Sequence, residues 1–135
     1  MSCHKILIID DDLIITKVLS AKLVADGFTV VSARDGGAAL ALIREGKPDL
    51  ILLDLSFPPD VAHGGGVFQD GLTLMGWIRS TQGNIPIIIT TAAESANLKD
   101  KALSMGAAEF FRKPIDTDKL LATIHATLGV VKEPA

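Results

Sequence analysis

Two short apolar runs of the sequence end in carboxylates. Asp10 and Asp11 follow the run at residues 5–9, and Asp54 follows the run at residues 50–53. Apolar runs of this length are typical of buried strands in a parallel sheet. Carboxylate oxygens are ligands that Mg²⁺ prefers, and a carboxylate can attack phosphorus to form an aspartyl phosphate. The pattern therefore predicts a magnesium site at the acidic pair and a phosphoryl acceptor at Asp54.

Two further strand-like runs end in a hydroxyl and an ammonium. Thr90 and Thr91 follow residues 87–89, and Lys113 follows residues 110–112. The oxygens of a transferred phosphoryl group gain negative charge, so a hydroxyl and an ammonium beside the acceptor would stabilise it. Taken singly, a strand threonine is usually a β-branched strand former, and a lysine is usually a solvated charge. The order and spacing of all four groups together point to magnesium-dependent phosphoryl transfer.

The elements that must position these side chains alternate along the chain. Strands are predicted at residues 5–9, 29–33, 50–53, 87–90 and 109–112. Between them, apolar residues recur at helical spacing, and capping residues and glycines mark the helix ends. Such alternation favours an α/β domain whose parallel sheet is covered on both faces. Ligands bind such sheets at the carboxyl ends of the strands, where the polar residues fall. The expected caps are Asp12, Asp35, Ser95 and Asp116, and the expected helix-ending glycines are Gly27, Gly46, Gly83, Gly106 and Gly129.

Composition limits the classes of function. The chain has 135 residues and a net charge of -3, which gives no basic footprint for nucleic acid. No apolar stretch approaches the ~20 residues that a membrane helix needs. The first strand begins almost at once, which leaves no room for a signal peptide, and the single Cys3 cannot form an internal disulfide. We therefore expect a cytoplasmic protein.

Four segments resemble, in order, the signatures of the receiver domain of two-component response regulators. They are residues 5–12, 48–54, 86–92 and 110–114. The resemblance implies a flavodoxin-like (βα)5 doubly wound sandwich with a five-stranded parallel sheet. It covers residues 1–129 as the receiver domain and leaves residues 130–135 as a C-terminal tail or the start of a linker.

The resemblance also implies a role for each matching residue. Asp54 is the phosphoacceptor, and Mg²⁺ is held by Asp10, Asp11 and Asp54 with the backbone carbonyl of Ser56 as a further ligand. The remaining roles are a switch hydroxyl on Thr91, a phosphate-contacting Lys113 before a cis bond to Pro114, and a switch aromatic at Phe110. The plainer interpretation of Phe110 is a phenylalanine at the core or its rim.

The function implied is that of a phosphorelay switch. A histidine kinase or histidine phosphotransfer protein donates a phosphoryl group to Asp54, with Mg²⁺ required. Phosphorylation then changes the face formed by the fourth helix, fifth strand and fifth helix. That face controls binding to a downstream protein target or to a second copy in a homodimer. The chain is expected to turn over no separate substrate and to contact neither nucleic acid nor membrane directly.

The sequence departs from the family pattern after Asp54. Extra residues at 59–70 precede Gly71, the glycine of the third helix. His63 and the glycines Gly64, Gly65 and Gly66 lie within this segment, which is interpreted as a lid over the site. The alternative is a tolerated surface insertion, because long loops add little entropic cost.

Two other classes of protein remain as alternatives. A small phosphatase of the haloacid dehalogenase type would use Asp10 as nucleophile and Asp12 as acid/base. The threonine usually seen shortly after that pair is absent, because position 14 is isoleucine. The second alternative is a degenerate receiver that serves only as a docking module, against which the full set of acids, threonine and lysine argues.

Overall fold

A computed structural model describes residues 4–55, 71–81, 84–91 and 96–129. Five strands and five helices alternate in these ranges, which confirms the predicted α/β class. The strands are β1 (Lys5–Ile9), β2 (Thr29–Ala33), β3 (Leu50–Leu53), β4 (Ile87–Thr91) and β5 (Glu109–Arg112). The helices are α1 (Leu13–Ala25), α2 (Gly36–Glu45), α3 (Gly71–Thr81), α4 (Ala96–Ser104) and α5 (Thr117–Leu128).

The five strands form one parallel sheet in the order β2-β1-β3-β4-β5. This order places the switch point of the topology between β1 and β3, which is where doubly wound sheets bind ligands. Four strands have the predicted bounds, but β4 is one residue longer and ends at Thr91 instead of Thr90. The extra residue belongs to the strand because Thr91 pairs with Arg112 of β5 and its carbonyl accepts the Lys113 N–H.

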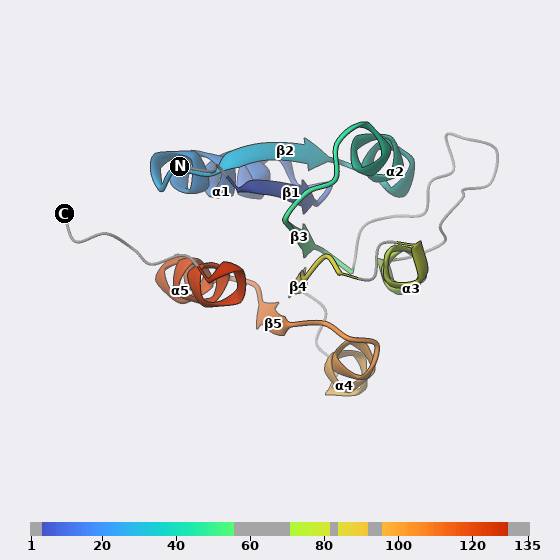
Figure 1. The fold of residues 1–135 in the computed structure, drawn as a ribbon. Coiled ribbons are helices and arrows are strands. Elements are labelled where there is room, and N and C mark those ends of the chain that lie inside the picture. The colour runs from blue at the N-terminus through green and yellow to red at the C-terminus, as the bar shows by residue number, and fades with distance from the viewer. Residues whose placement is uncertain (1–3, 56–70, 82–83, 92–95, 130–135) are drawn as a thin grey trace.

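Helices cover both faces of the sheet, with α1 and α5 on one face and α2, α3 and α4 on the other (Figure 1). Because strand side chains alternate between faces, each strand contributes to two separate apolar clusters. The sheet residues Ile6, Ile8, Leu50, Leu52 and Ile88 belong to the cluster on the α1/α5 side. The residues Leu7, Ile9, Ile51, Leu53, Ile87 and Ile89 belong to the cluster on the opposite side. Burial on both faces explains why β1, β3 and β4 are continuous apolar runs.

Three aspartates cap the helices that they were predicted to cap. The Asp12 carboxylate accepts the N–H groups of Ile14 and Ile15 at 2.9 and 3.2 Å. Asp35 and Asp116 accept N–H groups in the first turns of α2 and α5 in the same way. These bonds satisfy donors that a helix start leaves unpaired. The cap predicted at Ser95 and the helix end predicted at Gly83 lie outside the described residues.

The helix-ending glycines do not share one conformation. Gly27, Gly106 and Gly129 have positive φ angles, as expected of glycines that end helices. Gly46 was expected to do the same, but its φ is -169°, an extended value. There the carbonyl of Gly46 accepts the Lys5 ammonium at 3.3 Å, so the chain turns toward β1 without a left-handed residue. No helix among the described residues has both the length and the apolar character to cross a membrane.

Candidate functional site

The sheet itself places the two buried acids side by side. Ile9 of β1 pairs with Leu53 of β3, and the next residue on each strand is an aspartate. The Asp10 N–H donates to the Ala33 carbonyl at 3.0 Å, and the Asp54 N–H donates to the Ile9 carbonyl at 2.9 Å. Both aspartates are 2% exposed. Their positions are therefore fixed by strand pairing and do not depend on loop structure.

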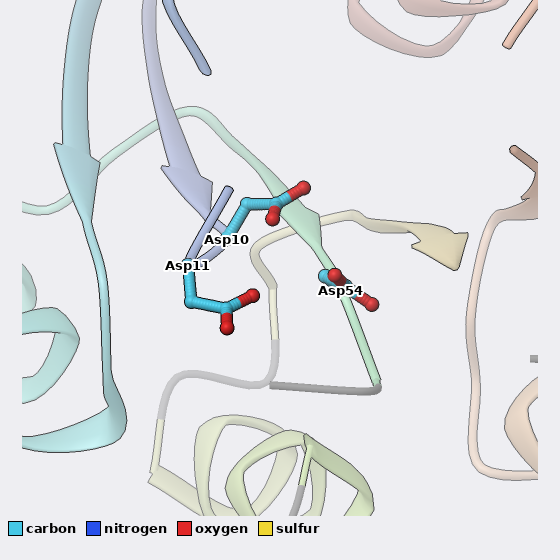
Figure 2. Close-up of side chains that lie close together, drawn as sticks. All are labelled: Asp10, Asp11 and Asp54. Carbon is cyan, nitrogen blue, oxygen red and sulfur yellow. The ribbon is translucent and has the colours of Figure 1, made fainter. Parts of the chain in front are cut away.

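Asp11 completes a cluster of three carboxylates. Figure 2 shows Asp10 and Asp11 at the end of β1 and Asp54 at the end of β3. Oxygen atoms of the three side chains lie within 4.8 Å of one another, and Asp11 is exposed. Hard oxygen donors at this spacing, with one side open to water, suit Mg²⁺, which keeps several waters when it binds. The fourth ligand predicted from the sequence, the Ser56 carbonyl, lies outside the described residues.

Lys113 bridges the two buried carboxylates. Its Nζ lies 2.7 Å from Asp10 Oδ2 and 3.0 Å from Asp54 Oδ2, and its side chain is 12% exposed. The Lys113 backbone N–H donates to the Thr91 carbonyl at 2.9 Å, and the bond to Pro114 is cis. Buried carboxylates without a counter-ion are unstable. The ammonium therefore neutralises part of the acidic cluster from the β5 side.

Burial and pairing act in opposite directions on the ionisation of this site. Burial raises the pKa of the Asp10 carboxyl, and the charge of Asp54 adds to this, while the hydrogen bonds from Lys113 and from the Asp12 N–H oppose it; the net pKa is raised. Burial lowers the pKa of Lys113, but its hydrogen bonds to Asp10 and Asp54 outweigh that effect and raise the pKa overall. The ammonium is therefore held in its charged form.

The raised pKa of Asp10 predicts a specific pH dependence. A carboxyl whose pKa is higher in the folded state binds protons more tightly when folded, so its contribution to the free energy of unfolding falls as pH rises. Without magnesium, the wild-type free energy of unfolding minus that of Asp10→Asn should decrease from about pH 4 to about pH 7. The ionisation of Lys113 adds no pH dependence to the free energy of unfolding in this range, because the stability that comes from its raised pKa is lost only at alkaline pH. Urea unfolding at several pH values measures this difference. Asp100→Asn, at an exposed position of α4, serves as the control. A difference that increases with pH contradicts the prediction.

The other predicted residues fall into three groups. Thr91 is fully buried at the end of β4. Phe110 of β5 is partly buried and packs against the apolar cluster on the side of α2, α3 and α4, as its plainer interpretation as a core or rim residue allows. The predicted lid residues His63, Gly64, Gly65 and Gly66, with the rest of the 59–70 segment, lie outside the described residues.

Asp12 bears on the phosphatase alternative. That alternative needs the Asp12 carboxylate as an acid/base beside Asp10, but its Oδ1 accepts the first N–H groups of α1. The Asp12 N–H donates to Asp10 Oδ1 at 2.9 Å. Asp12 is thus a capping residue, as the plainer interpretation of the acidic triplet held.

An apolar groove next to Lys113 was not anticipated from the sequence. It has a volume of about 220 Å³ and lies between α1 and the segment that joins β5 to α5. Ile14 and Val18 of α1 line it and are 76% and 48% exposed. The sequence did contain evidence for this groove, because α1 has more apolar residues than the one face that packs against the sheet requires. The helical spacing of Ile15, Leu19 and Leu23 identified only the stripe that faces the core.

Comparison with known proteins places the chain in a family. The family described as "Response regulator receiver domain" matches residues 6–125. Response regulator MprA of Mycobacterium ulcerans (strain Agy99) is 34% identical over 128 residues, which cover 95% of this chain and 51% of the relative. The chain thus spans about half the length of the curated relatives it matches.

Solved structures agree with the sequence comparison. A response regulator receiver domain protein (CheY-like) from Methanospirillum hungatei JF-1 has a TM-score of 0.84 at 27% identity, with 95% of each chain covered. Chemotaxis protein CheY4 of Vibrio cholerae has a TM-score of 0.78 at 27% identity, with 93% of this chain and 98% of CheY4 covered. These neighbours confirm the flavodoxin-like arrangement expected from the sequence. The chain belongs to the response regulator receiver domain family.

Proposed function

We propose that this chain accepts a phosphoryl group on Asp54 from a phosphohistidine donor, either a histidine kinase or a histidine phosphotransfer protein. The observation that carries the proposal is the contact of one buried ammonium, that of Lys113, with both Asp10 and Asp54. A purely structural strand-end acid has no need of a second buried acid and a shared cation, because burying charges is costly. Family membership supports the same function.

The chemistry assigned to each residue follows from its position. An Asp54 oxygen attacks phosphorus while the phosphorus–nitrogen bond of the donor histidine breaks. The Lys113 ammonium and the Thr91 hydroxyl then bind phosphoryl oxygens, which become more negative in the transition state. Asp10, Asp11 and Asp54, with the Ser56 carbonyl, would hold Mg²⁺. When bound, the ion supplies positive charge to the same oxygens.

The output of the switch is assigned to the face of α4, β5 and α5. Lys113 follows β5 directly, and its N–H is bonded to the Thr91 carbonyl, so a change at Asp54 reaches both strand ends. Phe110 is proposed to rotate between two positions as this face changes. The face then binds a downstream protein target or a second copy of the chain, without direct contact to nucleic acid and without turnover of a separate substrate. Residues 1–129 are proposed as the receiver domain, with 130–135 as a tail or the start of a linker.

Incubation with acetyl phosphate and Mg²⁺ tests the proposal, with intact mass as the measurement. The protein should gain the mass of one phosphoryl group, and a chelator should prevent the gain. A protein that gains the group equally well in the chelator contradicts the role given to Mg²⁺.

The groove beside Lys113 is proposed as the docking surface for the protein donor. Ile14, Val18 and Lys113 all line it, and Lys113 also contacts Asp54. A partner that places an apolar helix face in this groove therefore brings its own phosphoryl group close to the acceptor.

Ile14→Lys should separate the two kinds of donor. It places a charge in the groove and should slow transfer from a phosphorylated histidine phosphotransfer protein by about tenfold, the size of one interface anchor. Acetyl phosphate should label the variant at the wild-type rate, because Ile14 is 76% exposed and its replacement leaves the site intact. Val24→Lys, on the same helix outside the groove and 58% exposed, serves as the matched control. Equal transfer to both variants contradicts docking in the groove.

A further inference from the structure

Asp10 is held at both of its carboxylate oxygens. Its Oδ1 accepts the backbone N–H of Asp12 at 2.9 Å, and its Oδ2 accepts the ammonium of Lys113 at 2.7 Å. Asp12 is the cap of α1 and Lys113 directly follows β5, so the two donors come from different elements of the fold. A carboxylate that is bonded at both oxygens cannot rotate freely. The orientation of Asp10 within the acidic cluster therefore depends on Asp12 as well as on Lys113.

Asp12 is in turn fixed by the first turn of α1. Its carboxylate accepts the N–H groups of Ile14 and Ile15. Its carbonyl accepts the N–H of Thr16 at 3.0 Å and the Thr16 hydroxyl at 2.9 Å. The backbone of Asp12 is extended, with φ -83° and ψ 106°, as is typical of a residue that caps the start of a helix. These bonds leave the Asp12 N–H to donate to Asp10, so the cap connects α1 to the acidic cluster.

The hydrogen bond from Asp12 also favours the form of Asp10 that can bind a metal. A carboxylate must be ionised to act as a ligand. Burial raises the pKa of Asp10, and the bond from the Asp12 N–H opposes that rise. Groups that hold a metal ligand in place are important for affinity, and their replacement typically weakens metal binding about 10- to 100-fold. Asp12 has this relation to Asp10.

We infer that Asp12 is a positioning residue of the magnesium site, an inference that rests on the proposed function. Its carboxylate bonds to α1 and fixes its own backbone, and its N–H then holds the Asp10 carboxylate in place. Asp12 thus acts through Asp10 and not as a ligand of the ion. The three consecutive aspartates have two tasks: Asp10 and Asp11 bind Mg²⁺ together with Asp54, and Asp12 orients the first of them.

Urea unfolding at increasing MgCl2 concentrations tests this role, because it gives both the Mg²⁺ dissociation constant and the stability without the ion. Asp12→Asn removes the charge but keeps an oxygen that can cap α1, so it should weaken Mg²⁺ binding only about two- to threefold in salt that screens exposed charges. Asp12→Ala removes the charge and the cap. It should bind Mg²⁺ about tenfold more weakly than Asp12→Asn, the lower end of the typical range, because the N–H itself remains.

Asp35→Ala is the matched control for the loss of a helix cap. The Asp35 carboxylate caps α2 by accepting the Ala38 N–H at 2.8 Å. Without Mg²⁺, Asp35→Ala and Asp12→Ala should lose similar stability, but Asp35→Ala should bind Mg²⁺ as wild type does.

Two results overturn the inference alone: Asp12→Ala that binds Mg²⁺ as tightly as Asp12→Asn, or Asp35→Ala that loses as much Mg²⁺ affinity as Asp12→Ala. Wild-type protein whose stability does not respond to MgCl2 overturns the magnesium site of the proposed function and this inference with it.

Discussion

Asp54→Asn is expected to abolish the mass gain seen after incubation with acetyl phosphate and Mg²⁺, while the fold stays intact. The amide oxygen of asparagine is a far weaker nucleophile than a carboxylate, so no aspartyl phosphate can form. Asparagine has nearly the same shape and can still accept a hydrogen bond from Lys113, which contacts Asp54 Oδ2 at 3.0 Å. Loss of one of three neighbouring negative charges also lowers their mutual repulsion. Intact mass and an unfolding curve measure the two expectations.

Asp10→Asn is the matched control for that result. It removes the neighbouring buried carboxylate but leaves the acceptor in place, so any loss of label should be reduced by raising the concentration of Mg²⁺. If the protein still takes the label after Asp54 is replaced, the assignment of Asp54 as the phosphoacceptor is wrong. If that label is located on Asp10, the phosphatase alternative becomes the better explanation.

Lys113→Ala should have the largest effect on stability in the absence of magnesium. The change leaves Asp10 and Asp54, each 2% exposed, without their shared counter-ion. Removal of one partner from a buried ion pair typically costs about 3–5 kcal/mol. Mg²⁺ should restore part of that free energy, because the ion would neutralise the same carboxylates. Urea unfolding with and without Mg²⁺ measures both effects.

Lys119→Ala, an exposed lysine of α5, is the control and should change stability little. Lys113→Ala should still bind Mg²⁺ through its carboxylates and take label, but phosphorylation should no longer change partner affinity or self-association. If coupling in this variant equals that of wild type, the role given to Lys113 is wrong. If its stability without magnesium matches that of Lys119→Ala, the ion pair does not stabilise the fold.

Much of the fold could be predicted because the preferences of short segments for strand or helix agree with the arrangement of the whole domain. Strands buried on both faces are largely apolar, so residues 5–9 and 50–53 could be assigned with their observed bounds. Capping aspartates at helix starts are equally local, because a side chain bonds to N–H groups only two or three residues away. The parallel sheet then brings the strand ends together whatever the loops do. For the same reason, the gathering of Asp10 and Asp54 at one edge of the sheet could be anticipated.

What could not be predicted depends on partners distant in the chain. β4 extends to Thr91 because Thr91 pairs with Arg112 and accepts the Lys113 N–H. Gly46, at the end of α2, is extended, and its carbonyl accepts the ammonium of Lys5 in β1. The strand order decides which strand ends are neighbours, and the apolar pattern of the strands does not reveal that order. The α1 groove was not predicted. Helical spacing identifies the apolar residues that face the core, but it does not identify the apolar residues that stay exposed on the rest of the helix.

The ion pair between Lys113 and Asp10 joins residues 103 positions apart. During synthesis on the ribosome, a nascent chain that has emerged only as far as β4 carries the three carboxylates without the ammonium that holds two of them. The first and last strands must therefore both be in place before the site exists. Under the proposed function, a chain that ends before β5 would lack the ammonium that Lys113→Ala also lacks, so it could not couple phosphorylation to a change in partner affinity.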